Sequence, residues 1–309
     1  MNTMLRTIVI SVLFSFHLVA IAQEQKLYLF ITADSLKQGV KDQDGHFVIP
    51  ADHPTVGYWS DGELIAESIL DFYGMPAHQA FDFDSLQAAY TANTTYDRQG
   101  KILYHPFFFD NGADYIREGA RRFVDVNTKK MGLVHPYGKI LIPARYDFVE
   151  PLESGYVRVY NGVKRKVEAG GEHWSIVPDP LKKYETFVLN KDGEKVVGKV
   201  ADAADTPVEL WRDSLHYPSY YTVTNKKEQK LLARIQQDPH VQKIFMGEGA
   251  PYCILERPTS GFPYYVIGQV KQFTPDYILV DQEGQLYHFD YYKPKMPLKA
   301  YLALNKGLE

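Results

Sequence analysis

The stretch Gly132–Val159, GLVHPYGKILIPARYDFVEPLESGYVRV, is the most regular part of this 309-residue sequence. Glycines at 132 and 138 frame short apolar runs, an Ile-Pro pair follows at 142–143, and Ser154-Gly155 closes the unit. Glycine reaches the positive φ values that tight hairpin turns need, and short apolar runs beside such turns are typical of strands. The stretch therefore predicts two hairpin turns. The strand after the first turn should end at Pro143, because proline cannot donate to a β-ladder.

The same frame recurs nearer the N-terminus at a constant offset of 93 residues. Gly39 falls on Gly132, and the match runs without a gap over 28 positions. Units that cannot bury an apolar face alone need stacked neighbours. We therefore predict about four degenerate repeats over residues 23–200, arranged as a partial propeller or as a ribbon. Their hairpin glycines are Gly45, Gly100, Gly138 and Gly193.

The central stretch resembles the WG-repeat (KWG-type) family. The residues that carry the likeness are Met131–Val134, Gly138, Ile142-Pro143, Tyr146–Val149, Leu152 and Gly155. Two departures concern the tryptophan of the family name, which is Met131 here and Gln38 in the first copy. The first copy also has His53-Pro54 where the family has Tyr-Asp. The resemblance covers about residues 37–200 and implies a β-rich scaffold, often exported or envelope-associated, without general catalytic residues.

The C-terminal part predicts a different architecture. Residues 201–224 begin with small and polar residues, as a linker or insert does, and residues 225–309 predict a small α+β domain. Asn225 is expected to cap a helix with Glu228 at the reciprocal capping position, and Asp238-Pro239 to begin a second helix. Four strands are predicted at 252–256, 264–270, 277–281 and 285–289, followed by a closing helix at 297–304. The expected fold class is mainly β, a WG-type β-hairpin repeat array with this small α+β domain.

Residues 1–22 predict a signal peptide. Arg6 precedes an apolar run from Ile8 to Val19, and Ala20-Ile21-Ala22 places small residues at −3 and −1 of a cleavage site after Ala22. The run is shorter than the roughly 20 residues that span a bilayer, so stable membrane insertion is not expected. The only cysteine, Cys253, lies far from this segment and cannot form an internal disulfide. We expect a periplasmic or secreted protein that is not a lipoprotein.

Charge and motif content favour no particular chemistry. The formal net charge is −4, which argues against a nucleic-acid partner, and the basic run Lys164–Lys166 is interpreted as a solvated loop. Asp42–Gly45 lacks ligating residues at both ends of a calcium loop and reads as a hairpin turn. His46, His135 and His288 are expected at the surface or as turn caps. Cys253 is expected as an inert buried residue.

We therefore assign no catalytic, cofactor-binding or metal-ligating residues and no cofactor. The favoured hypothesis is an exported, non-enzymatic scaffold that binds another envelope protein or a cell-wall glycan. The alternatives are an envelope hydrolase whose carboxylates come from distant residues, and an inhibitor or immunity-type module. Aromatic residues offer a stacking surface or simply fill a thin β-core, and the second interpretation is preferred. These residues are Tyr58, Trp59, Phe107–Phe109, Trp174, Tyr291 and Tyr292.

Overall fold

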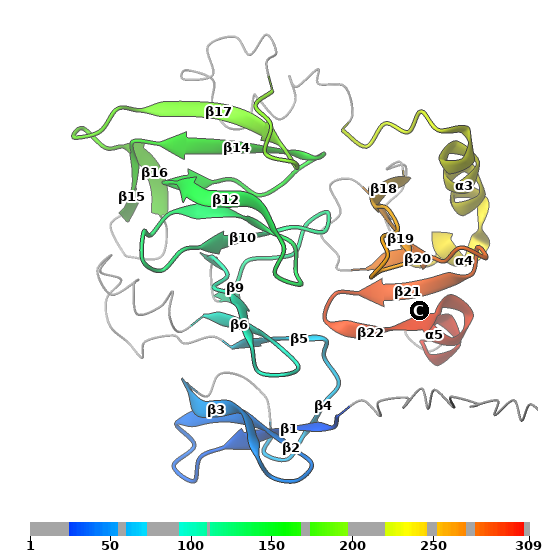
Figure 1. The fold of residues 1–309 in the computed structure, drawn as a ribbon, viewed down its shortest axis with the longest axis horizontal. Helices are drawn as coiled ribbons and strands as arrows, with labels where there is room; N and C mark the ends of the chain where they lie inside the picture. Colours follow the sequence, from blue (N-terminus) through cyan, green and yellow to red (C-terminus); the bar gives the residue numbers. More distant parts are fainter. Residues whose placement is uncertain are drawn as a thin grey trace, which may run out of the picture.

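The computed structural model describes residues 25–54, 60–72, 93–109, 112–167, 174–196, 220–245, 252–269 and 276–305. The predicted signal peptide and most of the predicted linker lie outside these ranges. Figure 1 shows a stack of small sheets that rises from β1 to β17, with a second unit of strands and helices beside it. The chain is mainly β, as predicted. We call the described residues 25–196 the repeat array and 220–305 the C-terminal unit.

Within the described residues, the repeat array is built on four antiparallel sheets that each contain a hairpin preceded by one strand. Their strands are β1 (Leu27–Ile31), β2 (Lys37–Asp42) and β3 (Phe47–Pro54); β5 (Ile69–Phe72), β6 (Thr94–Asp97) and β7 (Ile102–Tyr104); β10 (Arg121–Val124), β11 (Met131–Val134) and β12 (Ile140–Tyr146); β14 (Tyr156–Asn161), β17 (Glu185–Asn190) and the return of the chain at 194–196. Further strands are β4 (Leu64–Ile65), β8 (Phe108–Phe109), β9 (Gly112–Ala113), β13 (Phe148–Val149), β15 (Val163–Val167) and β16 (Trp174–Pro178).

The β2–β3 and β11–β12 hairpins share one register. Val40 lies opposite Ile49, and at the offset of 93 residues Leu133 lies opposite Ile142. The pairs Gln38–His53 and Met131–Tyr146 correspond in the same way. The ungapped alignment of the two stretches is therefore confirmed at the level of individual pairs.

The prediction that proline ends the second strand of each hairpin is wrong. Strand β12 continues to Tyr146, because Pro143 lies in a bulge where three residues face Gly132 alone. A bulge takes proline out of the ladder, so no hydrogen bond is lost. The bulge also brings the backbone onto Gly132, where a Cβ would lie 2.3 Å from the Ile142 carbonyl oxygen. Glycine at this position is therefore required by close backbone approach.

The hairpins stack in chain order through their turn glycines. A Cβ on Gly100 would lie 2.1 Å from the Val48 carbonyl oxygen, and one on Gly138 would lie 3.3 Å from Cδ2 of Leu103. Gly193 likewise faces Leu141 and Ile142. Each turn glycine thus contacts the residue three positions after the glycine of the preceding hairpin. This recurring contact is the nearest-neighbour arrangement expected of repeat proteins.

Successive repeats are also joined because a strand of one repeat pairs with a strand of the next. Strand β14 closes the unit that begins with β11, but it pairs along its whole length with β17 of the next hairpin. The sequence repeat and the sheet are therefore offset by one strand. One unit therefore completes its sheet only with a strand of the next unit.

The C-terminal unit is a five-stranded meander with helices on one face. Its elements are α3 (Lys226–Gln237), α4 (Pro239–Gln242), β18 (Tyr252–Glu256), β19 (Tyr265–Gln269), β20 (Tyr277–Val280), β21 (Leu286–Asp290), β22 (Lys293–Pro297) and α5 (Leu298–Leu304). Ile254 and Ile278 pack under the helices with Ile235. Their neighbours Cys253 and Leu279 point to the opposite face, which packs with Ile69 and Ile116 of the repeat array. No helix of the described residues is long and apolar enough to cross a membrane.

The predicted helix caps Asn225 and Asp238 are confirmed, since both side chains accept backbone N–H groups of the following helix. Three details differ. The Glu228 carboxylate binds Arg257 through two hydrogen bonds of 3.0 Å, which replaces the expected capping box. Strand β22 was not predicted, because its sequence KPKMP is polar and carries proline, as an edge strand allows. Lys164–Lys166 lies within strand β15, not in a loop.

Candidate functional site

We call the contact between the repeat array and the C-terminal unit the junction. Many of the buried titratable groups lie there. Glu118 lies in a tight turn whose two central residues, Glu118 and Gly119, both have positive φ. Its carboxylate accepts hydrogen bonds from the backbone N–H groups of Ser154 (2.7 Å) and Gly155 (2.8 Å), and from the Tyr221 hydroxyl (2.7 Å). Its carbonyl oxygen accepts from Nζ of Lys191. Burial lowers the pKa of Lys191. This group ties two repeats to the C-terminal unit.

A second junction group is centred on Glu256 of β18. It accepts hydrogen bonds from Nε2 of His135 (3.2 Å) and from the Tyr291 hydroxyl. Nδ1 of His135 accepts the backbone N–H of Tyr137 (3.1 Å), so Nε2 carries the ring proton. Burial raises the pKa of Glu256, but the hydrogen bonds from His135 and Tyr291 outweigh it, and the net shift is downward. The pair holds a hairpin turn of the array against the C-terminal sheet.

The third group is built on Asp71 of β5. Arg121 donates to both of its carboxylate oxygens, at 3.0 and 2.7 Å. Thr95 Oγ1 (2.5 Å) and the Tyr292 hydroxyl (2.9 Å) donate as well. Four hydrogen bonds occupy the acceptor positions of this carboxylate. Asp71 is therefore a structural anion and has little capacity left to act as a base or nucleophile.

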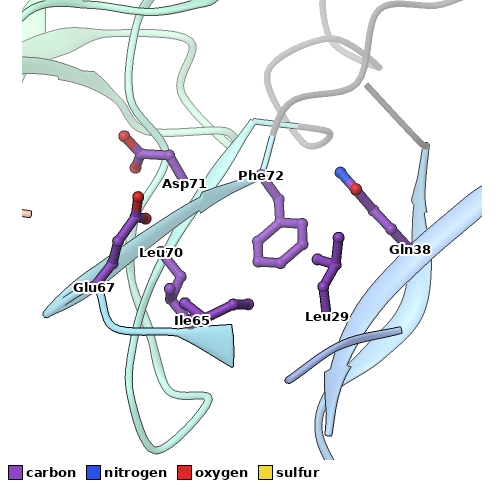
Figure 2. Close-up of a pocket in the computed structure, with 7 residues that line it drawn as sticks. All are labelled: Leu29, Gln38, Ile65, Glu67, Leu70, Asp71 and Phe72. Carbon is purple, nitrogen blue, oxygen red and sulfur yellow. The ribbon is translucent and has the colours of Figure 1, made fainter. Parts of the chain in front are cut away.

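A small crevice beside Asp71 is lined by two carboxylates, Glu67 and Asp71. It has a volume of about 30 Å³ and is lined by Leu29, Gln38, Ile65, Glu67, Leu70, Asp71 and Phe72. Figure 2 shows the Glu67 and Asp71 carboxylates on one side of the Phe72 ring and the Gln38 amide on the other. Burial, followed by the charges of Asp71 and Asp290, raises the pKa of Glu67 to about 7. The crevice has room for little more than a water molecule or two, so it cannot admit a sugar.

The repeat array also carries a recurring exposed residue. The second position after the hairpin glycine is Phe47, Ile102 and Ile140 in the first three hairpins, with 51%, 51% and 46% of the residue surface exposed. The fourth hairpin has the exposed Lys195 there. Because the hairpins stack in order, equivalent positions follow one another along the array. We call Phe47, Ile102 and Ile140 the apolar row.

Basic residues accompany the apolar row. The residue before each member is His46, Lys101 or Lys139, and all three are exposed. Lys101 and Lys139 form no salt bridge with the described residues. Repeated apolar side chains beside cations that have no ion-pair partner among the described residues are an arrangement suited to contact with another molecule. Periodicity identifies these strands, but which apolar residues face outward becomes clear only from the stacking.

The remaining candidates are placed as follows. Cys253 is buried, and burial together with the Glu118 charge raises the pKa of its thiol to about 12. Phe107, Phe108 and Tyr291 are core residues, as the preferred interpretation predicts. Trp174 is half-buried against Phe107 and Phe148. Tyr58, Trp59 and the Phe109 side chain lie outside the described part of the chain.

The predictions for the histidines and the calcium-like segment had mixed outcomes. His46 is exposed, and His135 caps its own turn. His288 was predicted wrongly: it is buried on β21, stacks on Tyr301 at 3.6 Å between ring centroids and binds Asp276 at 2.6 Å. Asp42–Gly45 forms the predicted hairpin turn. The carboxylates of Asp42 and Asp44 lie near His46, but Asp42 is committed to the backbone N–H groups of Asp44 and His46.

Comparison with protein families gives a match in the most regular part of the sequence. Residues 131–162 match the WG containing repeat. The matched segment runs from β11 to the end of β14 and thus covers one unit with its closing strand. No curated protein and no solved structure matches the chain.

Proposed function

We propose that this protein is an exported, non-enzymatic scaffold that binds another protein of the cell envelope through the apolar row. In this proposal the four hairpins are diverged copies of the WG containing repeat that matches at 131–162. The observation that carries it is the repetition of an exposed apolar residue at one position of three stacked hairpins. Repetition along an array gives a partner several equivalent contacts, and repeat proteins bind along such extended surfaces.

The flanking charges favour a particular kind of partner. Lys101 and Lys139 stand beside Ile102 and Ile140 without salt bridges to described residues, so an occupant with acidic and apolar side chains would complement both. A neutral glycan would leave these cations unpaired. A protein segment of acidic and apolar character is therefore the preferred partner.

The hydrolase alternative has less support. The Glu67–Asp71 pair lines a crevice of about 30 Å³, and four hydrogen bonds engage Asp71. An inverting or retaining glycosidase needs two available carboxyl groups on opposite sides of a bound sugar.

The proposal that the protein is exported rests on the signal-peptide pattern of residues 1–22.

The test is a capture experiment on an envelope extract with residues 23–309. The row variant F47K/I102K/I140K introduces the residue type that the fourth hairpin already carries at this position. The control is Leu181→Lys, which changes an apolar residue of 92% exposure outside the row. We expect one protein to be retained by the wild type and the control, and at least tenfold less by the row variant. Equal retention by all three, or turnover of an envelope substrate, would refute the proposal.

A further inference from the structure

The C-terminal unit contains an open groove on the side away from the repeat array. Figure 1 shows α4, α5 and the start of β21 close together at the outer edge of this unit. The groove between them has a volume of about 410 Å³, within the range of small-molecule sites. It is lined by Arg234, Asp238, His240, Gly284, Gln285, Leu286, Pro297, Leu298 and Lys299. None of these residues belongs to the apolar row or to the junction.

Two of the five polar side chains that line the groove are cations, Arg234 and Lys299, and one is an anion, Asp238. Arg234 and Lys299 form no salt bridge with the described residues, and both line the groove. The single carboxylate, Asp238, is engaged by its role as a helix cap: it accepts the backbone N–H groups of His240 and Val241. It also lies 3.2 Å from Nδ1 of His240. Within the described part of the chain neither Arg234 nor Lys299 has a carboxylate at salt-bridge distance, which favours an anionic ligand.

The position of Arg234 is fixed by the turn between β20 and β21. Its Nη2 donates to the Gly284 carbonyl oxygen at 3.2 Å, and a Cβ on Gly284 would lie 2.7 Å from Nη1. The guanidinium therefore rests on a glycine that has no side chain to displace it. Because this contact already restricts the Arg234 side chain, less side-chain entropy is lost when a ligand binds.

Apart from Gln285, the rest of the lining is apolar. Leu298 is buried at the start of α5, and Leu286 and Pro297 stand next to the groove from β21 and β22. A hydrated inorganic anion would leave this surface in contact with water, whereas an anion with an apolar body would cover it. We infer that the groove binds a small organic anion, an apolar carboxylate or phosphate monoester, whose charged group pairs with Arg234 and Lys299.

Binding is tested by isothermal titration of residues 23–309 with three probes: decanoate, phenyl phosphate and inorganic phosphate. The variants are R234Q and K299Q, which remove one positive charge each and leave a polar side chain. The matched control is Lys243→Gln, an exposed cation at the end of α4 that does not line the groove. Circular dichroism and the melting temperature establish that each variant is folded.

We expect one of the two organic anions to bind, with a Kd at least tenfold weaker in R234Q and K299Q and unchanged in K243Q. Tenfold is the change expected from the loss of one charge-assisted hydrogen bond. Decanoate binding indicates a carboxylate ligand, and phenyl phosphate binding indicates a phosphate ester. Three results would overturn the inference: no binding of either organic anion, equal binding in R234Q, or inorganic phosphate binding as tightly as phenyl phosphate.

Discussion

At the scale of single residues, the position that holds tryptophan in the WG-repeat pattern differs between two hairpins, and in one of them it leaves a buried oxygen atom without a hydrogen bond. Met131 and Gln38 occupy this position in two hairpins of identical register, and both are buried. Methionine packs there as an apolar residue. Oε1 of Gln38, in contrast, has no hydrogen-bond partner in the described structure. A buried acceptor without a partner costs about 1–3 kcal/mol.

Gln38→Met should therefore stabilise the protein by about 1–2 kcal/mol, because it removes the unpaired oxygen and copies the residue of the third hairpin. Equilibrium urea unfolding at pH 7 measures the change. The control, Gln43→Met in the exposed first turn, should alter the free energy of unfolding by less than about 0.5 kcal/mol. Destabilisation by Q38M would mean that the amide has a partner such as a bound water in the crevice.

At the scale of the elements, turn chemistry made the hairpins predictable. Asp42, Asp97, Asn190 and Asp281 each begin a turn that ends in a glycine with positive φ, and such turns are visible in sequence. The bulges are not predictable in this way, because proline in a strand pattern indicates the end of a strand and nothing local indicates that three residues will face one glycine. Strand β22 was missed because an edge strand needs no apolar alternation.

The bulge makes Gly132 sensitive to any side chain. Gly132→Ala places a Cβ 2.3 Å from the Ile142 carbonyl oxygen and 2.8 Å from Phe123 Cε1. We expect the free energy of unfolding to fall by about 3 kcal/mol or more, because the β12 backbone cannot move away from the new Cβ without breaking its pairing with β11. Gly261→Ala is the control, since no atom lies within 4 Å of its Cβ position and its φ is not positive. Melting curves of both variants measure the difference, and equal melting temperatures would contradict this account.

At the scale of the whole molecule, the two units are joined by buried charges and one face of a sheet. The sequence predicts the strands of the C-terminal unit, and the structure shows that both faces of its sheet are covered, one by the helices and the other by the repeat array. The sequence does not predict the junction, because the side-chain partners of Glu118, Glu256 and Asp71 lie more than 20 positions away along the chain. No periodic signal marks such pairs, which is why the sequence predicted the units and not the junction.

Glu67 makes stability depend on pH at this junction. Its folded pKa of about 7 lies above the ordinary 4.5, because burial and the charges of Asp71 and Asp290 disfavour ionisation. Below pH 4.5 the residue is protonated in both the folded and the unfolded chain, so it has no effect. As the pH rises from 4.5 to 7 the unfolded chain loses its proton first, and the folded state is progressively destabilised relative to it.

Glu67→Gln should therefore be more stable than the wild type at pH 8 and equal to it near pH 4.5. The full shift corresponds to about 3 kcal/mol, which the partial exposure of Glu67 reduces to about 1 kcal/mol. Urea unfolding of both proteins between pH 4.5 and 8 gives the difference at each pH. Glu63→Gln, an exposed glutamate on the other side of β4, is measured as the control. A stability gain of E67Q that does not vary with pH would exclude ionisation as its cause and leave only a packing effect in the crevice.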